Sequence, residues 1–172
     1  HYMQGVYETQ DRASEVVVSA FCKLSTKSDS CFTAKNRRLS VHHSLRIAQG
    51  DTVTLEKIVW VTHRSDKALS QETFARNALA DLKVCAARGY ASLLESSACA
   101  WEDVWRVARV EVTSAEQQDQ QALDYAVWHL TTMTPAHDER SSIAAKGLTG
   151  EGYKGHVFWD TEIFLLPFHL FT

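Results

Sequence analysis

A single change in hydrophobic spacing, near residue 70, constrains the fold of this chain more than any other feature. Before residue 70, apolar and polar residues alternate, the period of two that is typical of antiparallel strands with one covered face. After Ser70, apolar residues recur every three or four positions, as on the buried face of a helix. We therefore expect an α+β chain with one boundary near residue 70, since no internal repeat indicates another.

Two strand-forming stretches are expected before the boundary. Residues 15–22 are rich in β-branched side chains and predict one strand. Residues 39–61 predict a hairpin, because two alternating runs flank Gln49, Gly50 and Asp51, which are typical of a turn. This part of the chain should therefore form antiparallel β structure.

The helical part begins with a long apolar pattern over residues 71–108. Gly89 is its expected weak point, because glycine destabilises a helix interior. A short extended piece, residues 109–113, follows. The apolar face of the long pattern consists of Leu79, Leu82, Ala86, Tyr90 and Leu93, then Trp101, Val104, Trp105 and Ala108.

Two more helices are expected towards the C-terminus. Ser114 and Gln117 form a capping box for a helix that runs to about Met133, and Pro135 ends it. The apolar segment 157–171 predicts a last helix that faces inward. The core face expected for the first of these two helices consists of Leu123, Ala126, Val127 and Leu130.

The composition excludes several classes of protein. With 45% hydrophobic and 23% charged residues, the 172-residue chain can bury a core and has no disordered bias. Its longest apolar run near the C-terminus, residues 163–168, is much shorter than the roughly 20 residues of a membrane-spanning helix. Residues 71–172 hold 8 basic and 14 acidic groups, net −6, so nucleic acid is a poor partner for them.

The four cysteines lack a CxxC pair or a regular spacing. Free thiols in a reducing compartment are therefore expected, which places the protein in the cytoplasm, and burial as small apolar side chains is favoured over metal binding. The four are Cys22, Cys31, Cys85 and Cys99.

A polar, Gly-rich loop over residues 136–156 is too long for a structureless connection and indicates function. Within it Gly150, Gly152 and Gly155 match the GxGxxG pattern of dinucleotide sites. That pattern should follow a strand and open a helix, whereas a helix and a polar loop precede it here, and Glu151 would repel a pyrophosphate. We therefore interpret these glycines as turn residues.

Two other site chemistries can be compared. A metal site is not expected, because the spacing of His137, His156, Asp160 and Glu162 fits no known ligand pattern. A carbohydrate site needs aromatic platforms beside charged groups that bind hydroxyls. The loop supplies both kinds, although the aromatic residues could equally form core and the charges pair with each other. The set is Tyr153, Phe158 and Trp159 with Asp138, Arg140, Lys146, Glu151, Asp160 and Glu162.

The run HDERSSIAAKGLTGEGYKGHVFWDTEIFLLPF, residues 137–168, resembles the start of the catalytic barrel in glycoside hydrolase family 65, the inverting α-glucoside phosphorylases. Upstream, residues 89–105 resemble the helical linker of that family. Residues 3–11 and 32–39 resemble its bacterial members that act on kojibiose. The resemblance thus covers essentially the whole chain.

The resemblance implies a domain organisation. Residues 1–70 would be the end of an N-terminal antiparallel β-sandwich, residues 71–113 a helical linker, and residues 114–172 the first helices of an (α/α)6 barrel. The absence of an initiator Met and the apolar end at Thr172 lead us to expect a multidomain fragment of a longer protein.

The resemblance also implies a reaction and a set of site residues. Phosphate attacks the anomeric carbon of an α-glucoside with inversion, and a single Glu, expected downstream of Thr172, acts as general acid. No catalytic residue is therefore expected in this chain. In the FWDTE motif, Trp159 would pack on the non-reducing glucose and Asp160 would accept its hydroxyl hydrogen bonds. Residues with a supporting role would be Glu162, Arg140, Lys146, Tyr153 and His156.

Further expectations and alternatives accompany this assignment. Substrates would be an α-linked glucose disaccharide and phosphate, with no cofactor, no metal, no membrane and no nucleic acid, and the full-length protein would be a homodimer. Maltose, nigerose or trehalose could replace kojibiose, and water could replace phosphate in a hydrolase of the same fold. A non-catalytic sugar-binding module is the alternative of another class. The isolated chain is expected to be inactive.

Overall fold

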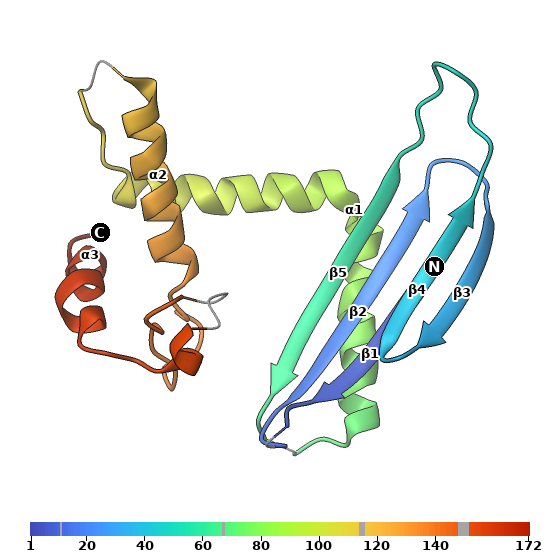
Figure 1. Cartoon of the computed structure of the whole chain (residues 1–172), viewed down its shortest axis with the longest axis horizontal. Helices are drawn as coiled ribbons and strands as arrows, with labels where there is room; N and C mark the ends of the chain where they lie inside the picture. The colour runs from blue at the N-terminus through green and yellow to red at the C-terminus, as the bar shows by residue number, and fades with distance from the viewer. Residues whose placement is uncertain (11, 67, 114–115, 148–151) are drawn as a thin grey trace. The chain divides into compact units, whose positions relative to one another are not determined.

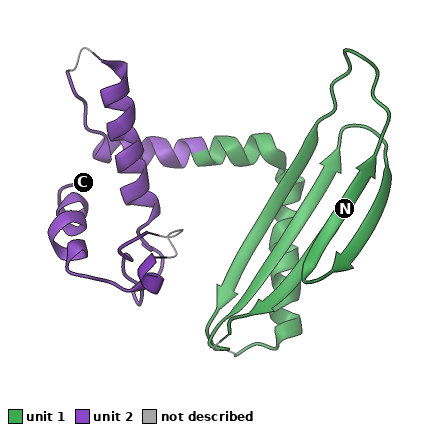
Figure 2. Ribbon diagram, viewed as in Figure 1, with its two compact units in different colours: residues 1–97 green, residues 98–172 purple. Residues whose placement is uncertain are grey.

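The computed structural model describes residues 1–10, 12–66, 68–113, 116–147 and 152–172. These residues form two compact units, 1–97 and 98–172, which are shown in two colours in Figure 2. The expected α+β character is confirmed, with antiparallel sheets in the first unit and helices after residue 70. In chain order the strands and regular helices are β1 Tyr2–Glu8, β2 Glu15–Leu24, β3 Asp29–Lys35, β4 Arg38–Ser44, β5 Leu55–Arg64, α1 Gln71–Ala108, α2 Gln117–Thr132 and α3 Leu166–Phe171.

In the first unit, a three-stranded antiparallel sheet has the order β1-β2-β5 (Figure 1). The alternation of β2 places Val17 and Ser19, which are both fully buried, on one face of the sheet. The first part of α1 lies on that face: the Gln4 side-chain amide donates hydrogen bonds to Ser19 Oγ and to the Ala75 carbonyl, both at 2.8 Å. Leu82 of α1 is fully buried as well. The apolar stripes of strand and helix thus form one core.

The predicted hairpin over residues 39–61 is wrong. Strand β4 pairs with β3 in a separate two-stranded sheet, and β5 pairs with β2 along its whole length. The tight turn of the β3–β4 hairpin is Asn36–Arg37, both with positive φ, as a two-residue hairpin turn requires. A turn does form at Gly50, whose φ is 93°, but ten residues separate β4 from β5 and allow them to join different sheets.

A buried ion pair fastens the end of this sheet to the start of α1. Arg64 donates from Nε to Glu15 Oε2 at 2.7 Å and from Nη1 to the Leu69 carbonyl at 2.6 Å. Its guanidinium carbon lies 4.5 Å from the centre of the Phe74 ring. The Gln71 amide donates to the second oxygen of Glu15 at 3.3 Å. Since the two charged side chains are only 10% and 7% exposed, they depend on each other for solvation.

Helix α1 is interrupted at Gly89, as expected. The φ and ψ angles of Gly89, 77° and 166°, are far from helical values and disfavoured for any residue with a Cβ atom. The helix restarts at Tyr90, whose backbone N–H donates to Oε1 of Glu56 on β5 at 2.6 Å. A carboxylate from a strand therefore caps the second part of the helix.

In the second unit, the end of α1 and helix α2 bury Ala108 and Val127. The rings of Trp101 and Trp128 stack at 6.4 Å. Of the core face predicted for α2, Val127 is buried and Ala126 is exposed. The helix begins after Glu116; Ser114, the predicted cap, lies outside the described residues.

The extended piece at residues 109–113 pairs with a side chain instead of a strand. Gln120 of α2 accepts from the Val112 N–H at 3.0 Å and donates to the Val110 carbonyl at 2.9 Å. Both hydrogen bonds use backbone groups that a ladder would otherwise use. The segment is therefore held in place without forming a strand.

The cysteines and the membrane expectation can be compared with this fold. All four cysteines are free, but only Cys22 is buried, while Cys31 and Cys99 are exposed. The expectation of burial was therefore wrong for those two.

Over the described ranges, every helix is too short or too polar to cross a bilayer.

Candidate functional site

A hydrogen bond joins the two ends of the segment that follows α2. Thr134, just after the helix, and His169 of α3 are joined by a hydrogen bond of 2.8 Å between Oγ1 and Nε2. Between them the chain makes a series of tight turns, such as the one closed by the Gly147 N–H and the Ala144 carbonyl at 2.8 Å. The predicted long functional loop is thus an ordered, closed segment in its described parts.

Two hydrogen bonds connect the early and late parts of this segment. The Ala145 N–H donates to the His156 carbonyl at 3.3 Å. The hydroxyl of Thr161 donates to the Ile143 carbonyl at 3.1 Å, and both of these residues are buried, at 8% and 6% exposure. These contacts place residues 143–145 beside residues 156–161.

The FWDTE motif, residues 158–162, lies at the start of the last helical stretch. Asp160 already has helical angles, φ −53° and ψ −36°, and its side chain caps no N–H group. A π-helical turn, Thr161–Leu165, follows it and continues into α3. The predicted helix over 157–171 therefore begins three residues late, because the chain from His156 to Phe158 is irregular.

Trp159 and Asp160 are both accessible to a ligand. The Trp159 side chain is 63% exposed and touches Phe164, with the ring centres 5.9 Å apart. Asp160 is partly buried, and its carboxylate has no hydrogen-bond or ion-pair partner among the described residues. An exposed aromatic ring can contact the apolar face of a sugar, and an available carboxylate can accept hydrogen bonds from its hydroxyls.

The other predicted residues fall into separate groups. Lys146 Nζ lies 5.7 Å from the centre of the Tyr153 ring, which in turn meets the Phe158 ring edge-on at 5.2 Å. Arg140 donates from Nε to Asp138 Oδ1 at 2.9 Å. The side chains of His156 and Glu162 are exposed. Asp138 and Arg140 thus pair, as the alternative anticipated, but its prediction that the aromatic residues form core is wrong, because Tyr153, Phe158 and Trp159 are all exposed.

Two alternative chemistries can be compared with the same geometry. Gly150 and Glu151 lie outside the described residues, and Gly152–Gly155 forms a short 3-10 turn with positive φ at Tyr153 and Lys154. The last strand of the described chain, β5, ends at Arg64, so no strand leads into the glycines. In the described ranges, no three His, Cys, Asp or Glu side chains are close enough to hold a metal.

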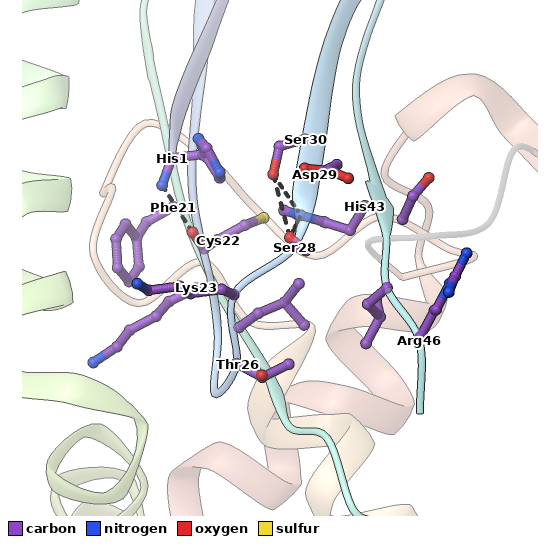
Figure 3. Close-up of a pocket in the computed structure, with 14 residues that line it drawn as sticks. His1, Phe21, Cys22, Lys23, Thr26, Ser28, Asp29, Ser30, His43 and Arg46 are labelled. Carbon is purple, nitrogen blue, oxygen red and sulfur yellow. Dashed lines mark hydrogen bonds between the residues drawn. The ribbon is translucent and has the colours of Figure 1, made fainter. Parts of the chain in front are cut away.

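A cavity of about 770 Å³ lies in the first unit and shares no residue with this segment (Figure 3). His43 lies at its wall, with Nδ1 3.0 Å from the hydroxyls of Ser28 and Ser30. The Lys23 and Arg46 side chains extend to opposite sides in Figure 3. These two cationic side chains therefore do not point to one ligand position.

The pairing of Asp138 with Arg140 yields a prediction on pH. The hydrogen bonds from Arg140 lower the pKa of Asp138 from 3.8 to about 2. Since this pKa is depressed in the folded protein, the stabilising effect is complete above pH 3.8 and is lost as the pH falls towards 2. Carboxyl titration by NMR should give a midpoint near 2, and Arg140→Gln should return it towards 3.8. An unchanged midpoint in that variant would contradict the pairing.

Sequence reasoning missed Thr161. No role was predicted for this residue, because the π-helical turn that accompanies its burial is not recognisable from a spacing of 3.6 residues.

Comparison with known proteins gives consistent results. The family description "Glycosyl hydrolase family 65, N-terminal domain" matches residues 2–104, and "Glycosyl hydrolase family 65 central catalytic domain" matches residues 124–172. A protein named kojibiose phosphorylase from Escherichia coli K12 is 54% identical over 172 residues, all of this chain and 23% of that protein. One of the same name from Halothermothrix orenii is 39% identical over 141 residues, 79% of this chain and 18% of that protein.

Two further comparisons concern fold and substrate. A solved structure titled putative kojibiose phosphorylase from human microbiome superimposes with a TM-score of 0.83 at 20% identity, over 98% of this chain and 22% of that one. A nigerose phosphorylase from Lachnoclostridium phytofermentans is 43% identical over 84 residues, 49% of this chain and 11% of that protein. The chain thus spans less than a quarter of the length of these relatives. From the two family matches, the chain belongs to glycoside hydrolase family 65.

Proposed function

We propose that the protein containing this chain is an inverting α-glucoside phosphorylase that acts on kojibiose. Inorganic phosphate attacks the anomeric carbon of the non-reducing glucose, the bond to the glycosidic oxygen breaks, and a general acid protonates that oxygen. The products are β-glucose 1-phosphate and glucose. Identity of 54% over the whole chain to a protein of that name supports this proposal.

The role proposed for this chain is to bind the non-reducing glucose through Trp159 and Asp160. The observation that carries it is that Asp160 has no partner for its carboxylate among the described residues, and that the preceding residue, Trp159, is 63% exposed. A carboxylate without a partner in the described part of the chain can accept hydrogen bonds from sugar hydroxyls. The aromatic ring would cover the apolar face of the same sugar.

The remaining residues have a supporting role in this proposal. Arg140 and Lys146 would act mainly by holding the loop, through Asp138 and Tyr153 respectively. His156 would act through its carbonyl, which accepts from Ala145. Glu162, with an exposed side chain, is proposed as a secondary contact.

The domain organisation is part of the same proposal. Residues 1–70 would belong to a β-sandwich, 71–113 to a linker and 114–172 to an (α/α)6 barrel. The general acid would come from the part of the longer protein that these 172 residues do not contain. The isolated chain is therefore expected to bind sugar without turning it over.

The test is an assay of the complete protein with four α-linked disaccharides: kojibiose, nigerose, maltose and trehalose. We expect glucose and β-glucose 1-phosphate in equal amounts, only when phosphate is present, and fastest from kojibiose. Nigerose is included because a nigerose phosphorylase is among the relatives. Glucose release that is independent of phosphate would identify a hydrolase, and no release from any of the four would refute the phosphorylase.

A further inference from the structure

Thr161 is buried and directly follows in sequence the two residues proposed to bind glucose. Its side chain is 8% exposed, whereas Trp159 two positions earlier is 63% exposed. Its hydroxyl donates to the carbonyl of Ile143, eighteen residues earlier, at 3.1 Å in a buried environment. The Thr161 side chain thus joins the FWDTE turn to a distant part of the loop.

The backbone of Thr161 takes part in the turn that carries Asp160, so the hydrogen bond of its hydroxyl to Ile143 also holds that turn. The Thr161 N–H donates to the Phe158 carbonyl at 3.2 Å, and its carbonyl accepts from the Leu166 N–H, which closes the π-helical turn. A π-helical turn has an extra residue per hydrogen-bonded ring, and such turns occur often at functional sites. The backbone of Thr161 is therefore hydrogen-bonded to Phe158 before Asp160 and to Leu166 after it, so the position of Thr161 affects the backbone on both sides of Asp160.

From this geometry we propose that Thr161 is a positioning residue for the sugar site. Its hydroxyl anchors the turn, and the turn aims the Trp159 ring and the Asp160 carboxylate at the same sugar. The inference rests on the proposed function, because it concerns the glucose contacts of those two side chains. Thr161 itself touches no substrate.

The physical basis is the cost of leaving a buried carbonyl without a donor. Valine has nearly the shape of threonine but no hydroxyl, so Thr161→Val leaves the Ile143 carbonyl unpaired and favours a shift of the turn towards other donors. A displacement of about 1 Å at a binding group can lower a rate by roughly 100-fold. Packing alone would be nearly unchanged by this substitution.

The experiment compares three variants of the complete protein. Thr161→Val removes the hydroxyl, and Thr161→Ser retains it. The matched control is Thr131→Val, which removes a 3.0 Å hydrogen bond from Oγ1 to the Val127 carbonyl inside α2, outside the FWDTE motif. The measurements are kcat, the KM values for kojibiose and for phosphate, and the melting temperature.

We expect Thr161→Val to lower kcat/KM for kojibiose at least tenfold, with unchanged KM for phosphate, and Thr161→Ser to restore most of the loss. Thr131→Val should change the melting temperature alone. Equal kinetics for the valine and serine variants would overturn the proposal, as would a valine variant that differs from wild type only in stability.

Two other outcomes can be distinguished from a positioning role: unfolding of the valine variant and failure of the proposed sugar-binding function. Where Thr161→Val unfolds at the assay temperature, Thr161→Cys replaces it, because a thiol has a similar volume but is a weak donor. Failure of the underlying function is recognised separately: in that case Asp160→Asn also leaves the kinetics of kojibiose unchanged. A loss with Asp160→Asn and none with Thr161→Val refutes the positioning role alone.

Discussion

Replacing Asp160 with Asn in the complete protein is expected to lower kcat/KM for kojibiose by one to two orders of magnitude. Hydrogen bonds from hydroxyls to a charged acceptor contribute about 1.5–3 kcal/mol. The amide keeps the shape of the side chain but loses the charge and one acceptor. Because Asp160 caps no N–H group, the folded structure should be almost unaffected by the change. Steady-state kinetics and thermal unfolding of the same sample separate the two effects.

The matched control is Glu139→Gln, the same loss of charge at an exposed carboxylate in the same loop. Its kinetics should stay near those of the wild type. That result would show that the loss of one negative charge in the loop does not by itself lower the activity. If the two variants lose equal activity, the loss comes from the changed electrostatic potential of the loop, and Asp160 does not contact the sugar.

Replacing Arg64 with Met is expected to cost about 3–5 kcal/mol of unfolding free energy, because it leaves the Glu15 carboxylate buried without its charged partner. The Leu69 carbonyl and the Phe74 ring lose contacts in the same variant. Urea denaturation followed by circular dichroism measures the loss. The change should affect the β-rich unit, where all of these residues lie.

Two further variants test the explanation. The double substitution Glu15→Leu with Arg64→Met should recover much of the loss, because an apolar pair avoids the buried charge. Arg106→Met breaks a 2.7 Å ion pair with Asp103 in which both side chains are 72% exposed, so it should cost less than about 1 kcal/mol. A similar cost for Arg64→Met and Arg106→Met would show that burial of the pair is not important.

Local patterns predicted the elements of the fold better than their pairing. The β-branched run at residues 15–22 and the break at Gly89 are both present, because each depends on the preferences of nearby residues. The partner of β5 depends on which strand it meets across ten intervening residues, and no local pattern contains that information. For the same reason, the predicted hairpin had the right strands and the wrong partners.

The candidate site was predictable in part. The resemblance in the FWDTE motif predicted Trp159 and Asp160 as sugar contacts; that role stays a prediction, with Trp159 exposed and Asp160 without a side-chain partner among the described residues. The pairing of Arg140 with Asp138 and the burial of Thr161 were not visible, because both follow from turns whose geometry is set by hydrogen bonds between distant residues. Side-chain types thus indicate which chemistry is present, and backbone geometry decides which groups remain available.

The break in α1 has a consequence for the evolution of the chain. Only with the Gly89 conformation does the helix restart at Tyr90 and present an N–H group to Glu56. A residue with a Cβ atom at position 89 would be strained in that conformation, and a continuous helix would leave the Glu56 carboxylate without this partner. Positions 56 and 89 are therefore coupled, and related sequences should retain or lose this Glu and this Gly together.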